Sequence, residues 1–205
     1  MDYLGHLIVV AAIYAILAIS LELVIGRMGL LSVAHAAFYG VGAYVSAVLS
    51  VRLEFSFLAA AGLGMLIASV ASLVVSLPSL RLHEDYFVVA TLGLQVIAFT
   101  LFNNWMQVTR GPLGIAGIPP PSLLGWKVNT QLEFAALAIA VGGLAWLIIG
   151  RLTTSPLGRV LLAIREDEVF AKAMGKHTMR VKVTAFAVSA ALAAMAGSLY
   201  AHYVS

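Results

Sequence analysis

The sequence predicts an all-α polytopic integral membrane protein with about six transmembrane helices and one further helix on the cytoplasmic side. Hydrophobic residues make up 62% of the 205 residues, and Asp, Glu, Lys and Arg only 10%, against about 25% charged residues in soluble domains. Six stretches are nearly free of charge, each close to the roughly 20 residues that cross a bilayer. We therefore expect residues 1–205 to form a single transmembrane domain, interrupted by one charge-rich stretch.

The first span is expected at 7–25, where Glu22 near the end is the only charge. Asp2 stands where a secretory signal would carry Lys or Arg, so this segment is interpreted as a retained span. Glu22 is expected to reach the membrane surface beside Arg27, as long charged side chains near span ends do. The later spans are expected at 28–51, 55–80, 86–109, 134–150 and 183–205.

Lys and Arg in the connections predict the orientation, because cytoplasmic loops retain positive charge. The loop 151–182 holds seven of them: Arg151, Arg159, Arg165, Lys172, Lys176, Arg180 and Lys182. Placing this loop in the cytoplasm also puts Arg27 and Arg81 inside, and leaves Arg52, Arg110 and Lys127 outside. The resulting nine against three predicts a multi-pass protein with its N-terminus outside.

Polar residues within the spans are candidates for a solute pathway. His35 is ionisable, and such groups in spans usually face the bundle interior or water; it either makes a structural hydrogen bond or lies on the path. Thr91, Gln95 and Asn103 give 86–109 polar points without charge. These suit a zwitterionic or neutral solute, but polar residues also hold helices together.

Two stripes of small residues at four-residue spacing predict close helix packing, with pore lining as the second interpretation. They are Ser32, Ala36 and Gly40, and Ser189, Ala193 and Gly197.

The connection 110–131 carries Pro119, Pro120 and Pro121 among several glycines. Proline runs forbid a regular helix and favour an extended path. On the outside, this segment is either a surface for a partner or a cap over a pathway, or else a rigid linker.

The charge-rich stretch, GRVLLAIREDEVFAKAMG at 158–175, is expected to be one helix of about five turns. Ser155 and Pro156 form a helix start, and Gly175 is a natural stop. Glu168 and Lys172 are spaced i,i+4, and Arg165 lies three residues before Glu168, so one face carries an ion-pair ladder.

This helix either lies on the lipid surface or docks a soluble protein. Lipid surfaces favour mostly cations, whereas this helix mixes both signs with apolar side chains such as Ala171 and Met174. Mixed charge with apolar contacts favours a specific protein interface.

Four motifs in the same order resemble the branched-chain amino-acid ABC-transporter permeases of the LivM type. They are GRMGLLSVAHAAFYGVGAY, LRLHEDYFVVATLGL, VTRGPLGIAGIP, and SPLGRVLLAIREDEVFAKAMG followed by RVKVTAFAVSAALAAMAGSLYA. The resemblance implies that 151–182 is a cytoplasmic coupling loop whose helix sits in a cleft of an ATP-binding subunit. Its docking surface would comprise Arg165, Glu166, Asp167, Glu168 and Gly175, and the apolar side chains of Ala171 and Met174 are expected to join it. Chains of this family continue beyond the last residues seen here, so the domain 1–205 is expected to be incomplete.

The resemblance further implies a permease subunit that moves leucine, isoleucine or valine by ATP-driven alternating access in a bacterial or archaeal cytoplasmic (inner) membrane. The implied partners are two ATP-binding subunits, a second related permease and a periplasmic or extracellular substrate-binding protein, besides membrane lipid. ATP and Mg would bind the partner subunits, with no cofactor on this chain. Urea, an amide or a sugar is the alternative cargo, and a motor-free secondary transporter or a membrane scaffold is the alternative class.

The sequence argues against catalysis on this chain. A phosphate-binding GxxxxGK[ST] loop fails at Phe170 and His177, and the HExxH pattern that begins at His83 ends in Phe87. There is no Cys and no G-x-S-x-G serine motif. We therefore expect no enzyme activity and no metal site, and the net charge of +3 is too small to indicate nucleic acid.

Overall fold

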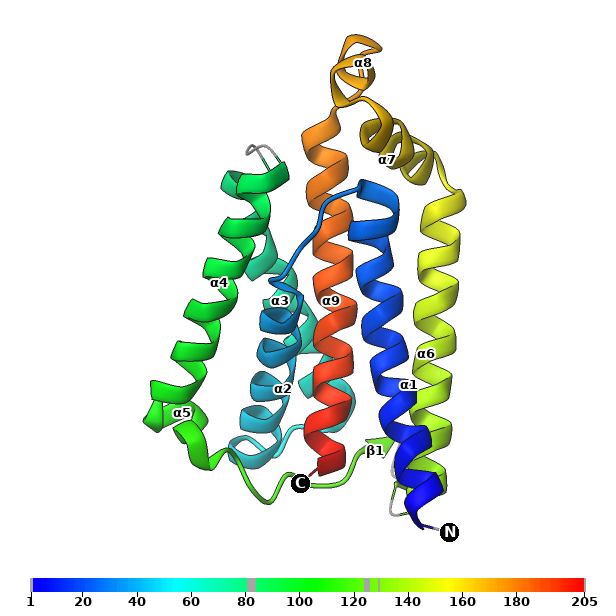
Figure 1. Ribbon diagram of the computed structural model, residues 1–205. Coiled ribbons are helices and arrows are strands. Elements are labelled where there is room, and N and C mark those ends of the chain that lie inside the picture. The colour runs from blue at the N-terminus through cyan, green and yellow to red at the C-terminus, as the bar shows by residue number, and fades with distance from the viewer. Residues whose placement is uncertain (1, 81–83, 124–125, 129, 205) are drawn as a thin grey trace.

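The computed structural model describes residues 2–80, 84–123, 126–128 and 130–204 as a bundle of long helices lying side by side (Figure 1). The long helices are α1 (Asp2–Glu22), α2 (His35–Arg52), α3 (Phe57–Ser79), α4 (Glu84–Asn104), α6 (Gln131–Thr154) and α9 (Thr178–Val204). The shorter helices are the π-helical η1 (Leu23–Arg27), α5 (Met106–Thr109), the 3-10 turn η2 (Gly111–Leu113), α7 (Pro156–Glu166) and α8 (Glu168–Ala173). Two-residue strands, β1 (Ser122–Leu123) and β2 (Trp126–Lys127), pair as an antiparallel hairpin.

Among the described residues, five helices are long and apolar enough to cross a membrane. They are Tyr3–Arg27, Phe57–Leu77, Asp85–Asn104, Gln131–Thr154 and Thr178–Val204. The all-α polytopic class is therefore confirmed, and the predicted span at 134–150 extends well beyond its charge-free core because flanking polar residues continue the helix.

One of the six predicted spans, 28–51, is shorter than expected and is not among these five. Gly29 takes a φ of +75°, which only glycine adopts readily, and the chain does not become helical again until His35. The resulting helix α2 has 18 residues and carries two tyrosines and two serines. It packs among the longer helices as a less apolar member of the bundle.

Helix α9 is the centre of the bundle. In Figure 1 it lies between α1 on one side and the pair α2 and α3 on the other, and it contacts all three. Of its most apolar stretch, 61% is buried, against 11% for α4, which stands at the edge. The core is therefore organised around α9, while α4 leaves most of its apolar surface uncovered.

Backbone contact between α2 and α9 depends on two glycines. A Cβ on Gly42 would collide with the backbone of Ala194, and one on Gly197 would collide with the carbonyl of Tyr39. The Ser198 hydroxyl adds a 3.1 Å hydrogen bond to the Gly42 carbonyl. Small residues here let the two backbones approach, which is how membrane helices gain dispersion contacts.

The two predicted stripes of small residues meet different surroundings. Ser189, Ala193 and Gly197 are all buried along α9, and the Ser189 hydroxyl donates to the Ser20 carbonyl at 2.5 Å.

The other stripe does not form one packing face. Ser32 is buried but precedes the helix, Ala36 is exposed, and Gly40 lies against Phe102 of α4. Ser32 lies outside α2, so four-residue spacing does not place it on the same helix face as Ala36 and Gly40. The residue of α2 that approaches α9 is Gly42 instead.

The ends of the bundle differ in character. One end carries both chain termini and the segment 111–128 (Figure 1). Pro119 to Pro121 lie outside any helix, as predicted. His202 Nδ1 donates to the Pro119 carbonyl at 2.8 Å and so ties this segment to α9. The opposite end carries α7 and α8 (Figure 1). Arg81 and His83 lie outside the described residues.

Candidate functional site

The site is built on α7 and α8, the two short helices that join α6 to α9. Ser155 caps α7 by accepting a hydrogen bond from the Gly158 amide at 3.4 Å, and Pro156 occupies the first helical position, as predicted. Leu161 and Ile164 turn the buried face of α7 toward the bundle. Gly175, with φ +75°, ends the segment, which is also as predicted.

The prediction of one helix of about five turns is wrong, because the segment breaks at Asp167. Asp167 is extended, with φ −157° and ψ 104°, and its carboxylate accepts a hydrogen bond from the Phe170 amide at 2.9 Å. Aspartate is a strong helix cap and a poor interior residue, since its short side chain competes for nearby backbone groups. Asp167 therefore ends α7 and starts α8 in a new direction.

Arg165 does not form the predicted ladder with Glu168. Its guanidinium donates a 2.5 Å hydrogen bond to the carbonyl of Gly26 in η1, and its aliphatic part lies over Gly29. The last carbonyls of a helix lack helical partners and carry partial negative charge, so a cation there is favourable. Arg165 thereby fixes α7 to the end of the first span.

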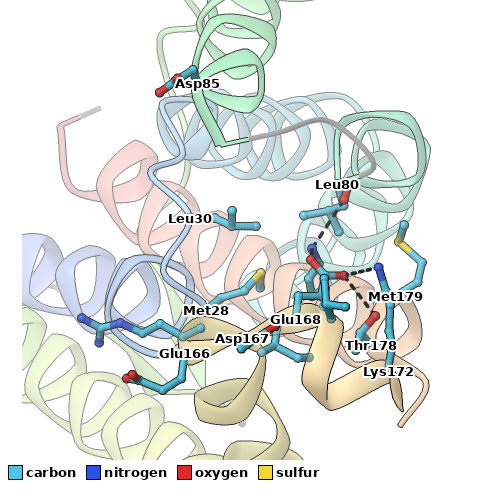
Figure 2. Close-up of a pocket in the computed structure, with 14 residues that line it drawn as sticks. Met28, Leu30, Leu80, Asp85, Glu166, Asp167, Glu168, Lys172, Thr178 and Met179 are labelled. Atoms are coloured by element: carbon cyan, nitrogen blue, oxygen red, sulfur yellow. Dashed lines mark hydrogen bonds and ion pairs between the residues drawn. The ribbon is translucent and has the colours of Figure 1, made fainter. Parts of the chain in front are cut away.

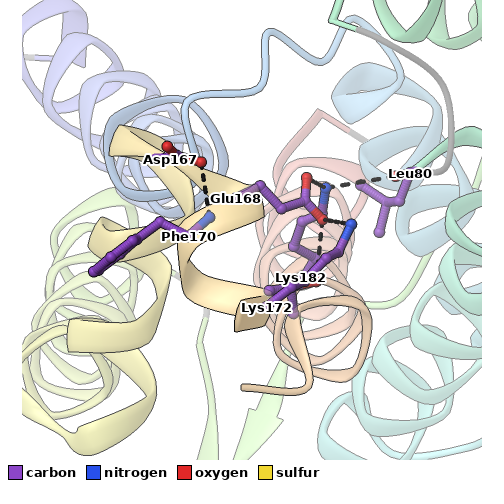
Figure 3. A network of polar contacts seen from close by, with 7 residues as sticks. Leu80, Asp167, Glu168, Phe170, Lys172 and Lys182 are labelled. Atoms are coloured by element: carbon purple, nitrogen blue, oxygen red, sulfur yellow. Dashed lines mark hydrogen bonds and ion pairs between the residues drawn. The ribbon is translucent and has the colours of Figure 1, made fainter. Parts of the chain in front are cut away.

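Glu168 is the centre of a polar network that joins α8 to α9 (Figure 3). Its carboxylate accepts hydrogen bonds from Lys172 at 3.0 Å, Lys182 at 2.8 Å and the Thr178 hydroxyl at 3.1 Å. The i,i+4 pair with Lys172 is as predicted. Partial burial raises the pKa of Glu168, but hydrogen bonds from Lys182, Lys172 and Thr178 outweigh that effect and hold the pKa below its ordinary value.

In the sequence, Lys182 is only one of the positive charges that predict a cytoplasmic loop, and nothing there identifies Glu168 as its partner. It is 4% exposed, and its ammonium group also lies 3.5 Å from the carbonyl of Leu80, just past the end of α3. A contact between residues 14 positions apart, across a turn, has no signature in helical spacing.

The outward surface of α8 carries large apolar side chains, and it differs from the predicted docking set. Met174 is exposed as expected, but Ala171 is 1% exposed and packs inward. Val169 and Phe170, which were not singled out in the sequence, are 76% and 63% exposed. Both stand within the acidic stretch, and a helix of six residues that buries Ala171 must point its neighbours outward. Glu166 and Gly175 are exposed alongside.

A cavity of about 780 Å³ lies between this segment and the ends of the neighbouring helices (Figure 2). Met28 and Leu30 form one side, Asp85 at the start of α4 another, and Glu166 and Glu168 a third. Arg165, Lys172 and Lys182 also line the cavity, so charged side chains of both signs gather at this end of the bundle.

The pathway candidates are dispersed rather than gathered. His35 is buried, and its Nε2 lies 2.7 Å from the Ser20 hydroxyl. This contact is a structural hydrogen bond, one of the two roles predicted for His35. Thr91 accepts from the Val33 amide at 3.2 Å, and thus links α4 to the chain before α2. Gln95 has a buried Oε1 with no hydrogen-bond partner, and Asn103 is half-buried. Their place on a solute path stays a prediction.

Glu22 and Arg27 form the expected pair at the end of the first span. Arg27 Nε lies 3.2 Å from Glu22 Oε1, and both side chains are partly exposed. The pair is thus a surface feature near the Arg165 contact.

Comparison with known proteins agrees with the motifs. The family model described as branched-chain amino acid transport system / permease component matches residues 3–205. The high-affinity branched-chain amino acid transport system permease proteins LivM of Salmonella typhimurium and Escherichia coli are each 35% identical over 92% of this chain. The Escherichia coli permease protein LivH is 28% identical over 93% of this chain and 67% of its own length.

The chain spans half the length of the two LivM relatives. No solved structure gives a significant match. The family model covers nearly the whole chain. The chain therefore belongs to the family of permease components of branched-chain amino acid transport systems.

Proposed function

We propose that this chain forms the membrane-spanning permease subunit of an ATP-driven importer of leucine, isoleucine or valine. ATP hydrolysis would take place on two separate ATP-binding subunits, which would hold ATP and Mg. The family and the names of the relatives support the transport role, and five helices in the described part of the chain are long and apolar enough to cross a membrane.

The observation that carries the proposal is the outward surface of α7 and α8. Val169, Phe170 and Met174 are exposed beyond the end of the helix bundle, where exposed apolar side chains normally mark an interface (Figure 1). Glu166 and Lys172 beside them are exposed and of opposite sign. A surface that combines apolar anchors with both charges suits a water-soluble protein partner better than anionic lipid.

The orientation follows from the same segment. We infer that 151–182 is cytoplasmic, which places the N-terminus and the proline-containing segment on the outer side of a bacterial or archaeal cytoplasmic membrane. The outer segment would then face a substrate-binding protein, and a second, related permease would complete the transmembrane unit.

In this mechanism the chain converts motor motion into a moving barrier. Closure of the ATP-binding subunits would displace α7 and α8, and the long helices would rock between outward-open and inward-open arrangements. A ligand shifts such an equilibrium only by its differential affinity for the two states, so docking must be tighter in one of them.

The first test is co-purification of the ATP-binding subunits with a variant of the proposed docking surface. The double substitution Val169→Asp and Phe170→Asp should remove most of the recovered ATPase, because it puts two charges where apolar side chains would be buried. Leu113→Asp is the matched control, since Leu113 is 88% exposed at the opposite end of the bundle. Equal recovery of ATPase with both variants would contradict the docking assignment.

The cargo is tested separately, in liposomes that contain the assembled complex and its binding protein. ATP-dependent uptake of leucine, isoleucine and valine is expected, with no uptake of urea or glucose above a control lacking ATP. Preferential uptake of urea or a sugar would keep the importer and replace the cargo.

A further inference from the structure

The polar network at α8 contains a buried cation that the docking proposal does not use. Lys182 lies at the start of α9 and is almost entirely buried, so it offers nothing to a partner's surface. Its ammonium group touches Glu168 at 2.8 Å and the Leu80 carbonyl at 3.5 Å (Figure 3). One side chain thus connects α8, α9 and the end of α3.

The energetics of a buried ion make this connection stiff. A lysine ammonium removed from water requires a partner, and separating a buried pair leaves an uncompensated charge at high cost. Glu168 therefore cannot move away from Lys182 without either dragging α9 along or exposing the cation to water. Thr178, which donates to the same carboxylate, adds a second contact to α9.

Helix α7 is held to a different part of the bundle. Arg165 donates to the Gly26 carbonyl at the end of the first span, on the far side of Asp167 from Glu168. The extended backbone at Asp167 interrupts the helix between these two attachment points. Figure 2 shows the same division, with Glu166 and Met28 on one side of the cavity, and Glu168, Thr178 and Leu80 on the other.

We propose that the Glu168–Lys182–Leu80 contact is the link that carries movement of α8 to α9 and α3, while the Arg165–Gly26 contact carries movement of α7 to α1. This inference rests on the proposed docking function and assigns Lys182 a positioning role within it. Asp167 is the joint between the two halves. A motor that pushes on the segment thereby acts on the bundle at two places, the end of the first span and the ends of α9 and α3.

Lys172 provides the matched control for Lys182. Both lysines bind the Glu168 carboxylate, at 3.0 Å and 2.8 Å respectively. Lys172, however, belongs to α8 itself and is exposed. Removing the charge of Lys172 takes one partner from the Glu168 carboxylate but leaves the contact between Glu168 and Lys182 of α9 in place.

The experiment measures leucine transported per ATP hydrolysed, in liposomes containing the whole complex, for Lys182→Met, Lys182→Arg and Lys172→Met. Co-purified ATPase is measured in parallel. We expect all three variants to retain the ATPase. Lys182→Met should lower the transport-to-hydrolysis ratio about tenfold or more, because it removes the buried cation that joins α8 to α9. Lys172→Met should change it by less than about twofold, as for an exposed pair.

A purely structural role for Lys182 predicts a different pattern. Fewer intact complexes would lower transport and hydrolysis together and leave their ratio unchanged, which would overturn the proposal. Lys182→Arg keeps the charge and should restore most of the ratio. If Lys182→Met fails to insert, Glu168→Gln removes the charge with almost no change of shape, and an unchanged ratio in that variant would overturn the link equally.

Failure of the proposed function gives a distinguishable result. In that case the wild-type chain recovers no ATPase at all, whatever residue occupies position 182. Loss of ATPase from Lys182→Met alone, with Lys182→Arg and Lys172→Met unaffected, would make Lys182 part of docking and would refute its role in transmission.

Discussion

Glu168 accepts hydrogen bonds from three donors on two helices, so its negative charge helps to stabilise the fold. Lys172, Thr178 and Lys182 all donate to its carboxylate. A protonated carboxyl keeps only part of that acceptor capacity and none of the charge. The segment between α6 and α9 is therefore held most firmly while Glu168 is negative.

The first prediction at the residue scale concerns pH. The folded-state pKa of Glu168 lies below its ordinary value, so its contribution to stability is fully present above the ordinary glutamate pKa of about 4.3. That contribution is lost as pH falls through the lower folded-state pKa. Thermal unfolding in detergent should therefore show wild-type protein more stable than Glu168→Gln at pH 7, with the difference shrinking below about pH 4. A difference independent of pH would contradict this role.

The sequence predicts contacts of these residues only where they are local. The i,i+4 spacing identified Lys172 as a partner of Glu168, because geometry within one helix is fixed. It could not identify Gly26 as the partner of Arg165, or Leu80 as that of Lys182, since these carbonyls come close only when separate helices pack. Nor could it separate Ala171 from Val169, because inward and outward positions depend on where α8 begins.

At the scale of elements, the close contact of α2 with α9 sets the spacing of the core. Gly42 and Gly197 allow backbone to meet backbone, and Ser46 bonds His202 at 2.9 Å near the same helix ends. Without a hydrophobic driving force between helices in lipid, such close approach is the main source of packing energy. Bulk added at this contact must separate the two helices.

We therefore predict that Gly197→Ala destabilises the protein by about 1–3 kcal/mol, because the new methyl group would overlap the Tyr39 carbonyl and force a backbone shift. Gly93→Ala is the control, since no other group lies within 4 Å of the added Cβ. The melting temperature in detergent, followed by size-exclusion chromatography, distinguishes the two. Alanine favours a helix over glycine by about 1 kcal/mol, so Gly93→Ala should not lower the melting temperature. A melting temperature lowered equally by both changes would contradict the packing explanation.

The elements themselves were predictable to different degrees. The lengths of the apolar stretches predicted six spans, one more than the five found among the described residues. They could do so because each crossing of a bilayer requires roughly 20 apolar residues. The extent of α2 was missed, since a charge-free interval does not reveal a positive φ at Gly29. The break at Asp167 was missed for a similar reason: an acidic residue inside a helical pattern is read as exposed surface, although its capping preference can divide the helix.

At the scale of the whole molecule, the two ends of the bundle are built for different surroundings. One end has the α7–α8 segment with its exposed apolar and charged residues, and the other has the extended segment that His202 holds to α9 (Figure 1). The long helix α9 runs between them and contacts α1, α2 and α3. A displacement at one end can therefore reach the other through a single continuous element.

The last prediction tests which end faces the cytoplasm. The sequence contains no cysteine, so a single introduced cysteine is the only thiol to react. Ala116 and Ala173 are both exposed, which allows the identical substitution at each. Ala116 belongs to the segment 111–128 and Ala173 to α8, which lie at opposite ends of the bundle (Figure 1). With a membrane-impermeant maleimide, Ala116→Cys should be labelled in intact spheroplasts and Ala173→Cys only in inside-out vesicles. Both should be labelled in detergent, which controls for reactivity. The reversed pattern would place α8 outside, where no ATP-binding subunit could reach it, and would overturn both the docking assignment and the link through Lys182.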